Sequence, residues 1–135
     1  MSAYPFVQFA QVGPLLFVSG HIAKRDGQPW VGKLGETMTT AEGKEAARSI
    51  AKDLLGTLEI ATGGNLDRIA RIAKLLVLVH SAPTFTEQHL VAHGASELIN
   101  EVFGGRGAHA RSAFGVAQLP FGVCVEIELI AEIAS

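Results

Sequence analysis

Hydrophobic residues recur with two different periods along this chain, and the change of period separates strands from helices. Near the start, two apolar runs flank the turn signal Val12-Gly13-Pro14, so residues 4–23 are predicted to form a β-hairpin. A nearly continuous apolar run at residues 69–82 predicts a long strand. Two further strands are predicted at residues 111–119 and 123–133, with Pro120-Phe121-Gly122 as the turn of a second hairpin.

Two other segments carry apolar residues at helical spacing. The first helix is predicted from an N-cap at Thr39 or Thr40 to Gly63-Gly64, and the second from residue 84 to Gly104-Gly105. Residues 24–36 are dense in glycine, proline and charge and are predicted to form a loop. The predicted apolar stripes consist of Ala47, Ile50, Ala51, Leu54, Leu55 and Leu58 on the first helix and of Leu90, Ala95, Leu98, Ile99 and Val102 on the second.

The resulting order of elements is β-β-α-β-α-β-β. This order predicts an α+β fold of two layers, in which two helices pack on one face of a mixed sheet. The length of 135 residues fits a single domain that spans residues 1–135.

Composition narrows the class of protein. Apolar residues make up 48% of the chain and charged residues 18%, which excludes a disordered or highly charged scaffold. The net charge of -2 lacks the clustered lysine and arginine that nucleic-acid binding usually needs. The mean hydropathy of +0.30 is high for a small soluble monomer, and it predicts apolar surface that is buried between subunits.

The sequence also carries signals about location. Cys124 is the only cysteine, so no intrachain disulfide can form, as is typical of a reducing cytoplasm. Residues 1–14 have no basic stretch followed by a long apolar run, and the apolar runs elsewhere are only as long as strands. We therefore expect a cytoplasmic protein without a signal peptide or a membrane span.

Arg111 opens a strand of small side chains. Strand alternation places it on the same face as Ala113, Gly115 and Ala117. Small neighbours leave room for a ligand beside the guanidinium group, whose planar fork can bind a carboxylate through two hydrogen bonds. The pattern therefore fits an anion site, although a surface arginine beside a closely packed helix would give the same pattern.

The last strand directs Glu126, Glu128 and Glu132 away from its apolar face. One carboxylate in a cleft could act as a general base, whereas a row of acids usually marks a solvent-exposed face. His89 and His93 are four residues apart on the second helix, which is a spacing that can bind a metal. No HExxH motif or clustered third ligand accompanies them, so no metal is expected.

Two blocks of the sequence resemble the signature blocks of a known family. They are FVSGHI at residues 17–22 and ARSAFGVAQLPFGVCVEIELIA at residues 110–131. Both are similar to blocks of the YjgF-like family of reactive intermediate deaminases (RidA), formerly labelled endoribonuclease L-PSP. The similarity extends from about Pro5 to Ala131, and the chain resembles a divergent subgroup.

The resemblance implies a chorismate-mutase-like homotrimer with three clefts between subunits. Such clefts bind small imines or enamines that carry a carboxylate, and hydrolyse them to 2-oxo acids and ammonia without a metal or an organic cofactor. Carried over to this chain, Arg111 would bind the substrate carboxylate and Glu126 would position the attacking water. Backbone groups of Ser19, Gly20 and Ala113 would line the pocket.

Other pocket positions depart from the family pattern. Phe6 stands where a tyrosine is usual, His21 replaces a glutamine, Ala113 replaces a frequent cysteine, and His89 lies near a position often held by asparagine. These departures leave open a second function, a non-catalytic module that senses small carboxylate metabolites in the same cleft. A ribonuclease, which the older family label suggests, is disfavoured by the charge balance and by the lack of aromatic stacking platforms.

The predicted second hairpin fixes the distance between the two charged residues. Its turn would place Glu126 opposite Val116 and leave Arg111 five residues farther along, about 17 Å away. No small acid spans that distance. If both residues act on one substrate, the arginine must come from one subunit and the glutamate from its neighbour.

Overall fold

The computed structural model describes residues 4–134. Five strands form one sheet in the order β1-β2-β7-β5-β6, and β3 pairs with β4 in a separate ribbon. The strands are β1 (Phe9–Val12), β2 (Leu15–Ile22), β3 (Lys24–Arg25), β4 (Gln28–Pro29), β5 (Ile69–His80), β6 (Ala110–Val116) and β7 (Val125–Ile133). The α-helices are α1 (Thr40–Ala61) and α2 (Gln88–Phe103), and short 3-10 helices occupy Leu66–Arg68, Gly104–Gly107 and Pro120–Gly122.

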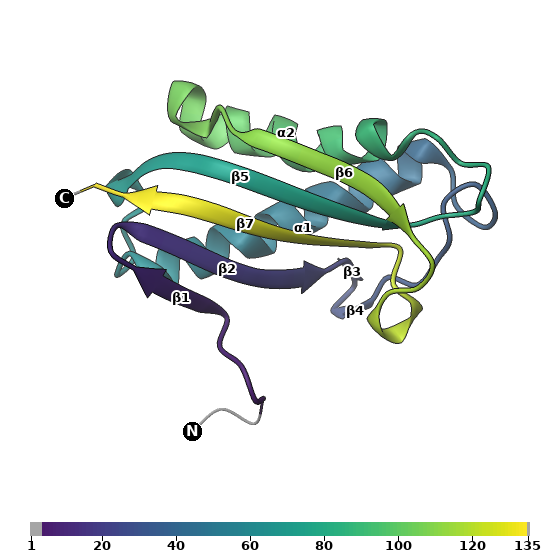
Figure 1. The fold of residues 1–135 in the computed structure, drawn as a ribbon, viewed down its shortest axis with the longest axis horizontal. Coiled ribbons are helices and arrows are strands. Elements are labelled where there is room, and N and C mark those ends of the chain that lie inside the picture. The colour runs from purple at the N-terminus through teal and green to yellow at the C-terminus, as the bar shows by residue number, and fades with distance from the viewer. Residues whose placement is uncertain (1–3, 135) are drawn as a thin grey trace.

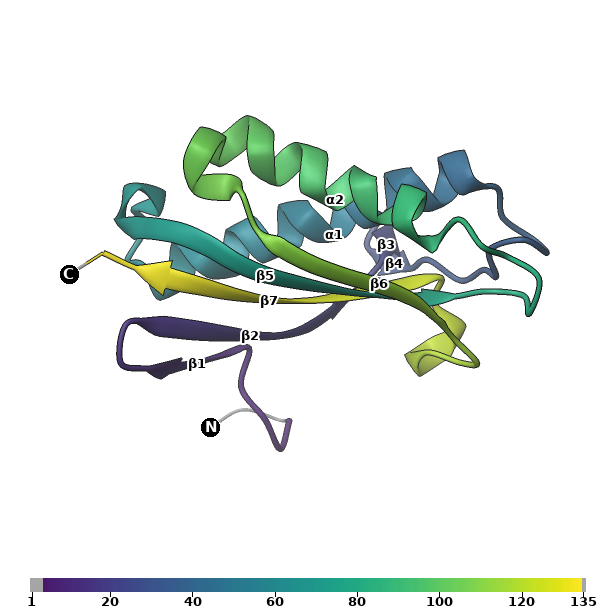
Figure 2. The same cartoon turned by 45° about the horizontal axis from the view of Figure 1, so that its top comes forward.

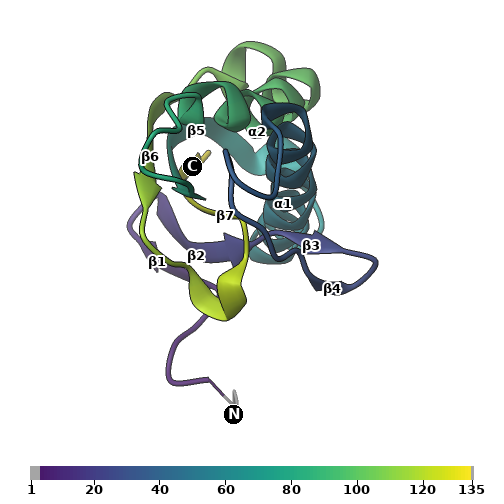
Figure 3. The ribbon, with the colours of Figure 1, turned by 90° about the vertical axis from the view of Figure 1, so that its right-hand side faces the viewer.

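Both α-helices lie on one face of the mixed sheet, which confirms the predicted two-layer α+β fold (Figure 1, Figure 2). Seen from the end, the sheet curves around one side of the helical layer (Figure 3). Neither α1 nor α2, the α-helices of the described residues, has the length and apolar composition needed to cross a membrane. The face of the sheet that the helices leave uncovered, called the open face below, carries Phe17, Leu76, Leu78, Glu126, Glu128 and Ile130.

Thr39, one of the two residues predicted as the N-cap of helix α1, caps it in a capping box. The backbone amide of Glu42 donates to Thr39 Oγ1 at 3.2 Å, and the amide of Thr39 donates to Glu42 Oε1 at 3.0 Å. Two amides at the helix start thereby gain partners. The predicted stripe faces the core, because Ala47, Ile50, Ala51, Leu54 and Leu58 are buried and Leu55 packs half-buried against them.

Helix α2 is shorter than predicted, and the face that it buries differs in part from the predicted one. Ala95, Leu98 and Ile99 are buried as predicted, whereas Val102 is 42% exposed. Val91 and Phe103 are buried in its place. The prediction for Val102 is wrong because α2 packs against α1 as well as against the sheet, and the buried arc is centred between these two contacts.

The two helices cross closely at Gly94. A Cβ atom at this position would overlap the backbone oxygen of Lys44 in α1. The helices can therefore adopt this separation only because position 94 has no side chain. This contact holds α2 over β6, where it reaches Arg111.

The connection between the last two strands differs from the predicted hairpin. Strand β6 pairs in parallel with β5, with Arg111 opposite Leu75, and β7 pairs antiparallel with the other edge of β5 and with β2. The sequence β5–α2–β6 is a strand–helix–strand crossover, which characteristically joins parallel neighbours. The 3-10 turn at Pro120–Gly122 therefore carries the chain past the end of β5, and the prediction of a β6–β7 hairpin is wrong.

The segment predicted as a loop between β2 and α1 also contains regular structure. Strands β3 and β4 form a small ribbon around Asp26 and Gly27, whose φ angles of 53° and 75° are those of a tight hairpin turn. The rest of this segment crosses the end of the sheet, where Leu34 N donates to His80 O at 2.9 Å.

Candidate functional site

Arg111 extends from the edge strand β6 toward α2 and is held there by three acceptors. Its Nη1 donates to His93 Nδ1 at 3.0 Å and to Ser96 Oγ at 3.1 Å. Its Nη2 donates to the backbone oxygen of His89 at 3.2 Å. All three partners lie on α2, so the packing of this helix sets the direction of the guanidinium group.

Arg111 keeps its charge without an acidic partner in the described residues. Both ion pairs found there, Lys44–Glu97 and Arg48–Glu101, join α1 to α2 and leave Arg111 out. Burial lowers the pKa of Arg111, because a cation is less stable away from water, yet an arginine remains protonated at any ordinary pH. An unpaired, half-buried cation of this kind is a suitable partner for an anion.

A hollow of about 520 Å³ adjoins this guanidinium group. It opens between α2 and the segment that leads into β6, and Ala108 is the one apolar residue among those that line it. The residues that line it are His93, Ser96, Glu97, Asn100, Ala108, His109 and Arg111. We call Arg111 together with its α2 partners and this hollow the arginine half-site.

Glu126 lies on the open face of the sheet, against β2. Its carboxylate passes directly over Gly20, where a Cβ atom would overlap Oε2. Burial raises the pKa of Glu126, and the nearby negative charge of Glu128 raises it further. Glycine at position 20 therefore makes room for a carboxylate that is more basic than an ordinary glutamate.

Two other predicted site residues are linked to Gly20, one by sequence and one by a hydrogen bond. Ser19 precedes Gly20 in β2, and its hydroxyl donates to the backbone oxygen of Val7 at 2.6 Å. This bond ties the segment that carries Phe6, a side chain with 53% of its surface exposed, to the strand beside Glu126. Phe6, Ser19, Gly20 and Glu126 are called the glutamate half-site below.

The two half-sites do not meet within one chain. Arg111 points toward the helical layer, whereas Glu126 points out of the open face. Their strands lie on either side of β5, at Leu75 and Leu78. Three residues along the strands and two strand spacings across the sheet separate the two Cα atoms by about 14 Å. The two residues are therefore somewhat closer than the predicted hairpin implied. One chain still cannot bring both side chains to one small substrate.

Of the other predicted site residues, Ala113 and His89 lie near Arg111, whereas His21 points toward α1. Ala113 shares the strand and the face of Arg111, and His89 supplies a backbone oxygen to the guanidinium group while its ring stays exposed. His21 follows a bulge in β2 and turns toward α1, where its Nε2 lies 2.8 Å from Thr57 Oγ1 and its Nδ1 lies 2.7 Å from Ser19 O. The His21 ring therefore points away from Glu126.

No sequence pattern pointed to Ser96 or His109, and His93 stood out only as a possible metal ligand. Ser96 Oγ lies 2.9 Å from His109 Nε2 and accepts a hydrogen bond from Arg111. No cluster of three or more histidine, cysteine or acidic residues suited to a metal occurs among residues 4–134. Of the two histidines four residues apart on α2, His93 contacts Arg111 through its ring and His89 only through its backbone oxygen.

Cys124 offers no nucleophile. The side chain is completely buried, and this burial raises the pKa of the thiol to about 11. The thiol is therefore protonated at neutral pH, and neither attack on a substrate nor metal binding is expected of it.

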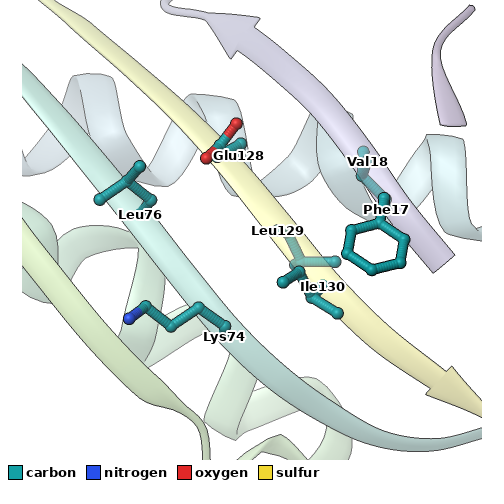
Figure 4. Close-up of a pocket in the computed structure, with 7 residues that line it drawn as sticks. All are labelled: Phe17, Val18, Lys74, Leu76, Glu128, Leu129 and Ile130. Atoms are coloured by element: carbon teal, nitrogen blue, oxygen red, sulfur yellow. The ribbon is translucent and has the colours of Figure 1, made fainter. Parts of the chain in front are cut away.

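The open face carries a shallow apolar hollow of about 100 Å³ in the middle of the sheet. Figure 4 shows Phe17 of β2, Leu76 of β5 and Ile130 of β7 around it, with Lys74 and Glu128 at its margin. Phe17 has 41% of its surface exposed in the isolated chain. Exposed aromatic and aliphatic side chains in one patch are typical of a surface that another protein covers.

Comparison with known proteins identifies the family. The family described as Endoribonuclease L-PSP matches residues 1–133. Protein TCP17 of Trypanosoma cruzi is 47% identical over 130 residues, which cover 95% of this chain and 81% of that protein. Among solved structures, Atu1372 of Agrobacterium tumefaciens, a protein of unknown function, is 42% identical with a TM-score of 0.94, over 97% of this chain and 83% of that one. A candidate endoribonuclease from Shewanella oneidensis is 28% identical with a TM-score of 0.92, over 98% and 88%. The chain therefore belongs to the YjgF-like, or Endoribonuclease L-PSP, family.

Proposed function

We propose that this protein hydrolyses small 2-imino or enamino acids to 2-oxo acids and ammonia, in clefts between the subunits of a homotrimer. The observation that carries the proposal is the separation of an unpaired guanidinium group and a basic carboxylate onto opposite faces of one chain. A neighbouring subunit can complete the site by placing its glutamate half-site against the arginine half-site.

The chemistry needs few groups. Arg111 binds the substrate carboxylate, and Glu126 of the neighbouring subunit takes a proton from water as the water oxygen bonds to the imine carbon. That proton passes to nitrogen and gives a carbinolamine. The hydroxyl proton of the carbinolamine then also moves to nitrogen through Glu126, the carbon–nitrogen bond breaks, ammonia leaves, and the carbon–oxygen bond becomes a carbonyl. Imine and water thus give oxo acid and ammonia. A carboxylate with a raised pKa is a better proton acceptor, and a fixed guanidinium group orients the substrate for attack.

The trimer is part of this proposal. The apolar patch around Phe17, Leu76 and Ile130 gives the open face the character of an interface, and the mean hydropathy of +0.30 agrees with burial between subunits. A second copy of the chain is the occupant that also completes the site. This single arrangement accounts for both the apolar face and the split between the half-sites.

A second candidate function is a binding module that senses small carboxylates without hydrolysing imines. Two observations favour it. Phe6 brings no hydroxyl group to the glutamate half-site, and the ring of His21 is bonded to Thr57 and Ser19 on the helical side. Either function needs Arg111, but only the first needs Glu126 as a base. Ribonuclease activity is not proposed, because the chain carries a net charge of -2 and no row of basic residues.

The deciding experiment measures ammonia release from an imine that an amino-acid oxidase generates in the same tube. We expect the protein to accelerate release well above buffer, the Arg111→Ala variant to lose both hydrolysis and oxo-acid binding, and the Glu126→Gln variant to lose hydrolysis alone. Release at the rate of buffer, together with oxo-acid binding that depends on Arg111, would select the binding module. Oxo-acid binding that is unchanged in Arg111→Ala would contradict both functions.

A further inference from the structure

Arg111 has a definite number of hydrogen-bond donors left for a ligand. A guanidinium group carries five N–H bonds: one on Nε and two on each Nη. Two acceptors face Nη1, and one faces Nη2. The Nε–H and one Nη2–H remain, and these two groups are neighbours on the guanidinium plane. Two adjacent donors are what the two oxygens of one carboxylate require.

The hydrogen bond from Arg111 fixes the protonation of His93, and a serine links the same guanidinium group to a second histidine. Arginine can only donate, so His93 Nδ1 must carry a lone pair and no proton. Ser96 Oγ accepts from Arg111 and also lies 2.9 Å from His109 Nε2, to which it can donate its own proton. His109 Nδ1 then donates to the backbone oxygen of Gly107 at 2.6 Å. A continuous chain of hydrogen bonds thus runs from the segment before β6 to the guanidinium group, and His93 in it is neutral.

We propose that His93 is a positioning residue that aims the free edge of Arg111 at the substrate carboxylate, supported by Ser96 and His109, and that its protonation disables carboxylate binding. The proposal rests on the proposed function, since it concerns the same guanidinium group. It adds a pH-dependent device that neither the signature blocks nor the family match assigns.

Protonation of His93 replaces an attraction by a repulsion. The imidazolium ring has no lone pair at Nδ1, so an N–H would face the Nη1–H of Arg111 and two positive charges would stand at hydrogen-bond distance. Histidine is the side chain whose charge normally changes between about pH 5 and 8. Protonation of His93 is therefore expected to release Nη1 and to turn the guanidinium group away from its position.

The other charged groups around His93 do not cancel this effect. On α2, the His89 ring lies edge-on with its centre 6.4 Å away, and Glu97 lines the same hollow. Glu97 is paired with Lys44 of α1 at 3.3 Å, so its charge is already balanced. The segment before β6 contributes His109, and β6 contributes Arg111 itself. Additional protons at this site thus add positive charge beside an arginine.

Whether carboxylate binding weakens or strengthens at low pH shows whether His93 positions Arg111 or only adds charge. A protonated histidine near an anion site would strengthen binding if only net charge mattered. Weaker binding at low pH is expected only if the direction of the guanidinium edge decides affinity. The pH dependence of carboxylate binding therefore distinguishes the two explanations.

Two variants at one position provide a matched pair. In His93→Asn, the amide oxygen can take the place of Nδ1 as acceptor and does not titrate, whereas His93→Leu removes the acceptor. Binding of pyruvate, a small 2-oxo acid, is measured by calorimetry at pH 8 and at pH 5. We expect the wild-type protein to lose affinity about tenfold at pH 5, His93→Asn to bind equally at both values, and His93→Leu to bind about tenfold more weakly at both.

A constant affinity in the wild-type protein, a tighter complex at pH 5, or a pH dependence that persists in His93→Asn would overturn the proposal. A second measurement needs no ligand. Nitrogen-15 NMR of the histidine rings at pH 8 is expected to show a proton on Nε2 of His93 and on Nδ1 of His109. The opposite tautomer at His93 refutes the positioning role even if pyruvate does not bind at all, whereas absence of binding with the expected tautomers refutes the proposed function alone.

Discussion

At the scale of single residues, Glu126 owes its basicity to its surroundings. Burial against β2 raises its pKa first, and the charge of Glu128, two residues away on the same face, raises it further. The proposed reaction needs Glu126 as a carboxylate, so activity is expected to fall as pH decreases through its pKa. A neighbour that raises this pKa therefore moves the loss of activity to higher pH.

Replacing Glu128 by glutamine tests this link. Removal of the like charge should lower the pKa of Glu126, so the acid limb of the pH profile of kcat/KM should move to lower pH. Glu132→Gln is the matched control, since Glu132 is also exposed on β7 but lies about 20 Å along the strand, beyond the range of screened charges at ordinary ionic strength. A profile that moves equally in both variants, or in neither, would argue against Glu126 as the titrating base.

At the scale of elements, the crossing of α1 and α2 determines where the arginine half-site lies. Gly94→Ala would drive a methyl group into the backbone of Lys44, which cannot move without displacing α1. We expect this change to lower the free energy of unfolding by about 1–3 kcal/mol, the usual effect of overpacking. Because α2 carries the partners of Arg111, the same displacement should weaken oxo-acid binding.

Gly56 of α1 provides the control for the same substitution. A Cβ atom at Gly56 has no neighbour within 4 Å, so alanine is expected to stabilise the helix by about 0.5–1 kcal/mol. Urea unfolding of both variants at one protein concentration measures the difference. If Gly94→Ala were as stable as Gly56→Ala, the close helix crossing would be excluded.

Periodicity in the sequence predicts the elements well but says little about which strands are neighbours. The N-cap at Thr39 or Thr40, the stripe of α1 and the face of Arg111 follow from local spacing, and the structure contains all three, with Thr39 as the N-cap. Strand pairing depends on contacts that are distant in sequence. The prediction of a β6–β7 hairpin was wrong because it was based on the turn signal at Pro120. The strand–helix–strand order β5–α2–β6, which usually joins two parallel neighbouring strands, was the better guide.

The candidate site is predictable to the same extent. Arg111 and Glu126 are identifiable from their strands, and Gly20 from its block, because each stands in a recognisable local pattern. Ser96 and His109 have no such pattern: they meet only because α2 folds back over the segment before β6. Likewise, the direction of His21 depends on a bulge in β2 that the sequence does not announce.

At the scale of the whole molecule, the two half-sites belong to different faces, and the proposed function depends on how copies of the chain assemble. In a ring of three identical subunits, each interface joins one face of a subunit to a different face of the next. Every proposed site then combines Arg111 from one subunit with Glu126 from its neighbour. A subunit that lacks one of these residues can still supply the other.

Mixed trimers make this arrangement measurable. The Arg111→Ala and Glu126→Gln variants, each inactive alone, are unfolded together in equal amounts and refolded. Any ring that contains both kinds of subunit has one interface where an intact arginine meets an intact glutamate, so random assembly should restore about a quarter of wild-type hydrolysis. If both residues acted within one chain, every site would lack one of them and mixing would restore nothing. A mixture that stays inactive, although sedimentation shows trimers, would therefore reject the shared site, and a chain that sediments as a monomer would reject the assembly itself.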